Sequence, residues 1–252
     1  MNDYLQLLRD IKKDGSNFVG RNGEVRGLFH QSMSMDLQFG FPLLSTKRMT
    51  LKTILYELLG FIRGDDSYIR DNTKIWDKWE GVLPYTHLAK LPSIIREIES
   101  NPFSRRLVLS HWEDPWIFGN LDGFALPTCH FACVFNVQPD NLGQPYKLNL
   151  SFFMRSSDVF IGLPFNIASY AAMLEIVAKY TGLIPGTLGY TGVDCHIYTQ
   201  HLELVDIQVM RKPQYYLPRL RIKNKPLMQL EPEDFIINNY NPHPAIKAEV
   251  VA

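Results

Sequence analysis

The chain has 252 residues and is 46% hydrophobic, so its length and apolar content allow a full core in one domain. Its 26 acidic and 26 basic residues balance, so no overall excess of positive charge points to nucleic acid or a membrane surface. No apolar run approaches the ~20 residues of a membrane span, no signal peptide pattern is visible, and three cysteines form no disulfide framework. The expected protein is therefore soluble and cytoplasmic.

The first part of the chain predicts helices. Apolar residues at helical spacing indicate a short helix near residues 5–11 and a second over 51–62. Thr50 is expected to cap the second helix, and Gly64 to end it. A third helix is expected after Pro92, with three isoleucines facing inward.

Strands are predicted where the apolar period changes to two. Residues 29–37 alternate, with Phe29 and the following odd-numbered side chains expected on the buried face. Residues 131–137 and 148–154 alternate in the same way and are separated by turn residues 139–143. Two short strands are expected further on, near 220–222 and 235–237.

A long apolar helix is predicted from Ile167 until Gly182 ends it. It carries few charges and is therefore expected at the centre of the molecule. We find no repeat, low-complexity tract or flexible linker, so residues 1–252 are expected to form a single domain. The predicted fold class is α/β, a mixed β-sheet with flanking helices.

Cys129 stands at the head of a predicted strand, in Leu126-Pro-Thr-Cys-His130. A cysteine there is either a nucleophile, if a cation stabilises its thiolate, or a small buried residue. Cys133 is expected to be such a small buried residue, on the apolar face of the strand. The two cysteines would lie roughly 13 Å apart along a strand, too far to share one zinc ion, so no metal site is expected.

Two arginine segments suggest an anionic ligand. Arg105 and Arg106 are adjacent, and can either grip a phosphate or lie on a solvated turn. Arg155 and Ser156 follow an apolar strand pattern, and ligands of α/β sheets commonly lie at strand ends.

Three polar residues complete the candidates. The amide of Asn166 either caps the apolar helix or pairs with the O4 and N3–H edge of a uracil ring. His196 and Tyr198 are two apart on an extended segment, so both point the same way. They either bind a sugar hydroxyl or form a satisfied pair in the core.

Together these segments resemble the thymidylate synthase family over nearly the whole chain. The longest matching stretch runs from Arg155-Ser-Ser-Asp158 through Gly162-Leu-Pro-Phe-Asn-Ile-Ala-Ser-Tyr170. Further motifs follow the family's order: Gly40–Leu43, Thr46–Arg48, Ile75–Asp77, Ser104–Arg106, Cys129–His130 and Pro242–Ala248.

The resemblance implies a thymidylate synthase-like subunit that dimerises through its sheet. It would convert deoxyuridylate and 5,10-methylenetetrahydrofolate to thymidylate and dihydrofolate, through a covalent bond from Cys129 to C6 of the ring. The implied catalytic residues are Cys129, Glu57, Asn166, Arg155 and Asp158. The implied nucleotide ligands are Arg21, Arg155, Ser156, Asn166, His196 and Tyr198, with Arg105 and Arg106 from the partner. The implied folate ligands are Lys47, Ile75, Trp76, Leu126, Asp158 and Ala252, and the C-terminal tail would close over the folate.

The sequence also departs from the family pattern. The usual Tyr-Gly-x-Gln-Trp-Arg stretch is missing between Trp79 and Pro102, where Tyr85 is the candidate for the relay tyrosine. Thr128 stands where proline is usual, and Met154 where glutamine is usual.

These departures leave two alternatives. The first is a deoxyuridylate 5-hydroxymethylase using the same folate; deoxycytidylate as its substrate is disfavoured by Asn166. The second is a non-catalytic relative that binds nucleotide or regulates a partner. The presence of Trp76 and of the tail opposes the first alternative.

Overall fold

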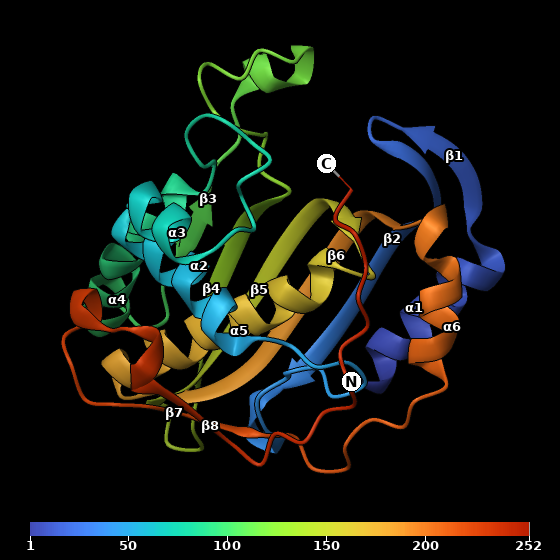
Figure 1. Ribbon diagram of the computed structural model, residues 1–252. Coiled ribbons are helices and arrows are strands. Elements are labelled where there is room, and N and C mark those ends of the chain that lie inside the picture. Colours follow the sequence, from blue (N-terminus) through green and yellow to red (C-terminus); the bar gives the residue numbers. More distant parts are fainter. Residues whose placement is uncertain (252) are drawn as a thin grey trace.

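The computed structural model, which describes residues 1–251, is built around a six-stranded sheet (Figure 1). Its strands lie in the order β1-β2-β6-β5-β4-β3. Their bounds are β1 Ser16–Gly20, β2 Gly23–Asp36, β3 Val108–Ser110, β4 His130–Pro139, β5 Pro145–Asp158 and β6 Ile184–Tyr198. Only β5 and β6 pair in parallel. The sheet is therefore mixed, which confirms the predicted α/β class.

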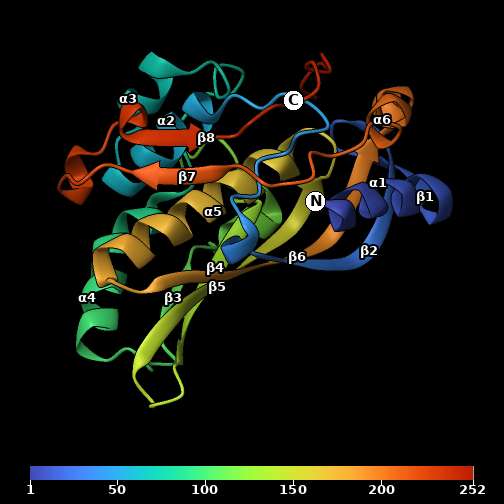
Figure 2. The same cartoon turned by 90° about the horizontal axis from the view of Figure 1, so that it is seen from below.

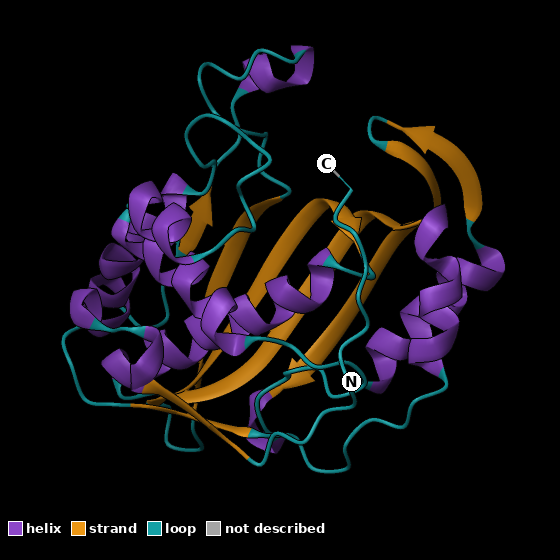
Figure 3. Cartoon of the chain, viewed as in Figure 1, coloured by secondary structure: helices purple, strands orange, loops and turns teal. Residues whose placement is uncertain are grey.

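The helices gather on one face of this sheet, as Figures 2 and 3 show. They are α1 Asn2–Asp14, α2 Leu51–Arg63, α3 Asp66–Asn72, α4 Leu91–Ser100, α5 Gly162–Thr181 and α6 Leu202–Val209. The helices predicted near 5–11, over 51–62 and after Pro92 are thereby confirmed. Gly64 ends α2 in the left-handed conformation, as expected, but Thr50 occupies the N-cap position without a side-chain hydrogen bond.

The predicted central helix is α5, and most of its side chains are buried around its whole circumference. One side packs on β5 and β6. A separate hairpin of β7 Arg219–Ile222 and β8 Phe235–Asn238 lies beyond α5 from the sheet (Figure 2). A helix covered on both sides has to be apolar over most of its surface, which explains why α5 carries few charged residues.

Two details of the strand prediction were wrong. Phe29 is 80% exposed, because the next residue, His30, adopts a φ of 49° that interrupts the alternation in β2. Phe131 is only partly buried, because the register of β4 against β5 shifts between His130 and Ala132. The buried alternation of 148–154 is confirmed in β5.

The helices leave the other face of the sheet uncovered (Figure 2). Phe29 and Val193 are exposed apolar side chains of β2 and β6. Within residues 1–251, no helix is both long and apolar enough to cross a membrane.

Candidate active site

The candidate residues from four separate segments meet at one cavity of about 390 Å³. Its wall is made by Phe18, Gly20, Arg21, Asn22, Val25, Trp79, Leu126, Pro127, Cys129, Arg155, Ser156, Asp158, Asp194, His196, Tyr198 and Val251. The parallel pair β5 and β6 supplies most of the polar groups, because Asp158 lies opposite His196 in their register. Both residues come at the carboxyl ends of their strands, where ligands of α/β sheets commonly bind.

Cys129 lies next to Arg155 because β4 and β5 run antiparallel. The backbone N–H of Arg155 donates to the carbonyl of Cys129 at 2.9 Å. The Arg155 side chain then turns back to donate to the Thr128 carbonyl at 2.7 Å and the Pro127 carbonyl at 3.1 Å. This double anchor holds the guanidinium, whose Nη2 is 3.8 Å from the Cys129 sulfur.

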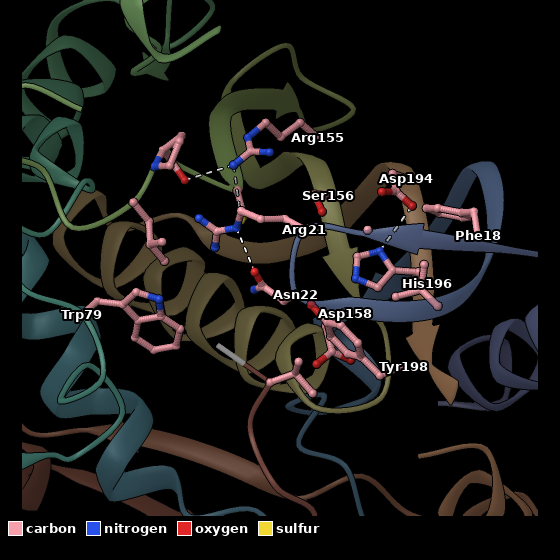
Figure 4. Close-up of a pocket in the computed structure, with 16 residues that line it drawn as sticks. Phe18, Arg21, Asn22, Trp79, Arg155, Ser156, Asp158, Asp194, His196 and Tyr198 are labelled. Atoms are coloured by element: carbon pink, nitrogen blue, oxygen red, sulfur yellow. Dashed lines mark hydrogen bonds and ion pairs between the residues drawn. The ribbon is translucent and has the colours of Figure 1, made fainter. Parts of the chain in front are cut away.

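Burial raises the pKa of the Cys129 thiol, while the charges of Arg155 and Arg21 lower it. Burial has the larger effect, so the free protein holds a thiol at neutral pH. Arg155 and Arg21 nevertheless both line the cavity (Figure 4), and their positive charges favour a negative charge on the Cys129 sulfur when it forms.

His196 and Tyr198 point into the same cavity from β6, as their spacing predicts (Figure 4). Their rings meet edge to face with centroids 5.4 Å apart. Nδ1 of His196 lies 3.2 Å from the Asp194 carboxylate, which fixes the orientation of the imidazole. Cys195, between them, points to the opposite side and contacts the Tyr190 hydroxyl.

Asp158 is held at the start of the loop into α5. Its Oδ1 accepts the backbone N–H groups of Phe160 and Ile161, each at 3.1 Å. Lys47 lies behind it, donates to the Phe160 carbonyl and packs over the Phe160 ring. Burial lowers the pKa of Lys47 to about 8, against the opposing charge of Asp158.

Glu57 on α2 accepts a hydrogen bond from the indole N–H of Trp76 at 2.7 Å. Burial raises the pKa of its carboxyl to about 7, and the indole donor lowers it by less. Trp76 is itself buried, and neither it nor Ile75 lines the cavity. Trp79 lines it instead, opposite the edge formed by Asp158 and Tyr198 (Figure 4).

Tyr85 reaches the backbone of Cys129, although it belongs to the segment that departs from the family pattern. Its hydroxyl oxygen is 3.4 Å from the Cys129 backbone nitrogen, which donates to it. Its ring stacks on His130 with centroids 3.8 Å apart and planes 6° apart. The pKa of its hydroxyl is raised by burial and by the nearby charges of Cys129 and Glu57.

Asn166 lies inside α5 rather than at its cap, so the capping interpretation was wrong. Its amide nitrogen is 3.5 Å from the sulfur of Met154, and it does not line the cavity. Arg105 and Arg106 are exposed and lie outside the cavity of their own chain. Ala252 is outside the described residues; its neighbour Val251 lines the cavity.

The sequence did not predict several of the wall residues, among them Phe18, Asn22, Trp79 and Asp194. Asp194 has a findable signal, because a residue two before His196 on a strand must share its face. The others reach the cavity through loop and strand geometry that no local pattern reports. Across residues 1–251, no group of three or more His, Cys, Asp or Glu side chains is arranged to hold a metal ion.

A cysteine beside a fixed arginine, with further polar groups at the ends of two parallel strands, defines an α/β enzyme that acts on an anionic substrate. The sequence matches the family model described as thymidylate synthase over residues 2–252, and the chain belongs to this family. It is therefore a thymidylate synthase-like transferase whose substrates are a pyrimidine nucleotide and methylenetetrahydrofolate.

Proposed function

We propose that this protein is a thymidylate synthase, which converts deoxyuridylate and 5,10-methylenetetrahydrofolate to thymidylate and dihydrofolate. We further propose that residues 1–252 act as one catalytic domain, in the cytoplasm, without a metal. The observation that carries the proposal is the distance of 3.8 Å between the Cys129 sulfur and a guanidinium anchored by two backbone carbonyls.

In the proposed mechanism, the Cys129 thiol loses its proton to water and its sulfur attacks C6 of the ring. The electron pair of the C5–C6 double bond then moves toward C5 and O4. Arg155, with Arg21 and Ser156, binds the nucleotide phosphate, and Arg155 also offsets the charge of the attacking sulfur. His196 and Tyr198 bind the ribose hydroxyl, and Asn166 contacts the ring edge. Asn166 does not line the cavity. Its proposed contact therefore requires the bound ring to extend past the cavity wall toward α5.

The second substrate supplies the one-carbon unit and the hydride, and the residues present fit it. Trp79 and Leu126 offer an apolar wall for a flat ring, and the Asp158 carboxylate at the edge accepts N–H groups from a pterin. Lys47, Ile75 and Trp76 would support this wall from behind, and Ala252 would end the closing tail.

Removal of the C5 proton is assigned to a network of Glu57 and Tyr85. A carboxyl with a pKa of about 7 exchanges protons readily at neutral pH. The C-terminal tail supports the exclusion of water: the Glu249 carbonyl lies 3.0 Å from His201, and Lys78 donates to the Val250 carbonyl at 2.9 Å.

We propose that the active unit is a homodimer formed through the uncovered face of the sheet. Exposed Phe29 and Val193 would be buried by a second copy. Arg105 and Arg106 would then reach the partner's phosphate site, which explains why two adjacent arginines lie outside their own chain's cavity.

The second candidate is deoxyuridylate 5-hydroxymethylation, favoured by the missing motif between Trp79 and Pro102. In that reaction water, rather than hydride, adds to the exocyclic methylene carbon. The docked tail favours methylation over this alternative.

Product analysis tests the proposal. After incubation with deoxyuridylate and methylenetetrahydrofolate, mass spectrometry should find thymidylate and an equal amount of dihydrofolate. Hydroxymethyl-deoxyuridylate with tetrahydrofolate would establish the second candidate. Bound nucleotide with no product would contradict both and favour a non-catalytic binding role.

A further inference from the structure

Near Tyr85, the buried His87 and Trp116 and the partly buried His111 hold buried polar atoms without a partner in the described part of the chain. Both ring nitrogens of His87, Nε2 of His111 and the indole nitrogen of Trp116 make no hydrogen bond there. His87 is 2% exposed and Trp116 is 4% exposed. An unpaired buried donor or acceptor costs about 1–3 kcal/mol, so four such atoms in one place need an explanation.

The three side chains form one cluster. The rings of His87 and His111 are nearly parallel, 12° apart, with centroids separated by 6.0 Å. His111 meets Trp116 edge to face at 5.0 Å. Rings with centroids 6.0 Å apart do not stack closely, and a water at their edges, in line with the ring planes, is the smallest molecule that can pair with nitrogens of both.

A shared partner must both donate and accept hydrogen bonds. Burial lowers the pKa of His87 to about 4, so the imidazole is neutral at physiological pH and offers one donor and one acceptor. The indole of Trp116 can only donate. Water with three such partners has the usual coordination of a buried solvent molecule.

This cluster is connected to the nucleophile on two sides. The His87 ring lies 6.2 Å from the Tyr85 ring, which also stacks on His130. The His111 carbonyl accepts the Thr128 hydroxyl at 2.9 Å, and Thr128 directly precedes Cys129. Tyr85 and Thr128 both lie where the sequence departs from the family pattern, so the contacts link these departures to one another.

We propose that His87 and His111 hold a buried water behind Tyr85 and thereby position its hydroxyl for removal of the proton from C5. His87 and His111 act through Tyr85 and are positioning residues. The inference rests on the proposed function, because the proton in question leaves C5 of the nucleotide while the C–H electron pair forms the exocyclic double bond and the folate nitrogen departs.

The test separates attack by Cys129 from the later loss of the proton. His87→Phe keeps a flat ring of similar size and removes both nitrogens, whereas His87→Gln keeps one donor and one acceptor. The covalent adduct with 5-fluorodeoxyuridylate and folate reports attack alone, because fluorine blocks the next step. Tritium release from deoxyuridylate labelled at C5 reports loss of the proton.

We expect His87→Phe to form the fluoro adduct as wild type does and to release tritium roughly tenfold or more slowly, with His87→Gln recovering most of the rate. Parallel loss of adduct and release, or no change in either, would overturn the inference while leaving the function intact. If wild type itself releases no tritium, the proposed function fails and the inference fails with it. If His87→Phe does not fold, His111→Phe and His111→Gln give the same comparison.

Discussion

Arg155 contributes more than a positive charge, because its side chain is fixed before any substrate binds. Two carbonyls of the turn that precedes Cys129 accept its N–H groups, so Arg155 and Cys129 are held by the same turn. In the proposed mechanism, this preorganisation lowers the cost of placing charge near the sulfur when the covalent bond forms.

Replacement of the nucleophile tests the covalent mechanism. Cys129→Ala should bind deoxyuridylate nearly as tightly as wild type, because the arginines and the ribose ligands remain. Its turnover should fall about a thousandfold or more, since no other side chain supplies the electron pair that attacks C6. Calorimetric titration and a product assay check the two parts; appreciable residual turnover would contradict the mechanism.

The amide of Asn166 sets the expected choice of base. A neutral amide can pair with the O4 and N3–H edge of uracil, whereas a carboxyl group suits the amino group and N3 of cytosine. Asn166→Asp should therefore shift the kcat/KM ratio toward deoxycytidylate, by roughly tenfold or more. Competition between the two nucleotides measures this shift, and an unchanged ratio would refute the ring contact.

Glu57 should make stability depend on pH. Its folded-state pKa of about 7 is above the ordinary value of 4.5, so its contribution to stability is present below pH 4.5 and lost as pH rises through 7. Because the residue is partly exposed, we expect a loss of about 2 kcal/mol between about pH 5 and about pH 8. Urea unfolding of wild type and Glu57→Gln at both values checks this: the variant should lack this part of the dependence.

At the scale of elements, the site depends on the β5-α5-β6 unit. The chain leaves β5 at Asp158, crosses the sheet through α5 and returns in β6, so the carboxyl ends of both strands meet at the cavity. The unit requires a sharp end to α5, which Gly182 provides with a φ of 69°.

The two ends of α5 make a matched pair of variants. Gly182→Ala should destabilise the protein by about 1 kcal/mol, because alanine is strained at positive φ even though its Cβ would meet no atom within 4 Å. Gly162→Ala, at the first residue of α5, should be neutral or slightly stabilising, because its φ is ordinary and the nearest contact is 3.7 Å. Thermal unfolding of both compares them; equal effects would contradict the conformational explanation.

At the scale of the whole molecule, the two uncovered features are the outer face of the sheet and the exposed arginine pair. The proposed homodimer would explain both, and it predicts that each site needs Cys129 from one chain and Arg106 from the other. Cys129→Ala and Arg106→Ala should each be nearly inactive when pure.

Mixing these two variants, with subunit exchange, should restore activity. About half of the dimers would be mixed and one site in each would be intact, so about a quarter of the wild-type activity is expected. A mixture that remains as inactive as its components would contradict the shared site. Co-elution of both chains in one dimer is the control for exchange.

The sequence by itself determined much of the architecture and the family. Local periodicity is a property of one segment, so the helices near 5–11 and over 51–62, the buried face of 148–154 and the central helix before Gly182 were all predictable. The spacing of His196 and Tyr198 likewise fixed their common face, because side chains alternate along a strand.

Tertiary structure alone decided which side chains meet. The register of β4, β5 and β6 sets Arg155 beside Cys129, and a shift at His130 turned Phe131 away from its predicted face. It also decided that Trp79 rather than Trp76 lines the cavity, and that the rings of His87 and His111 lie side by side. These are contacts between segments distant in sequence, and no local pattern encodes them because the free energy of each pairing depends on the rest of the fold.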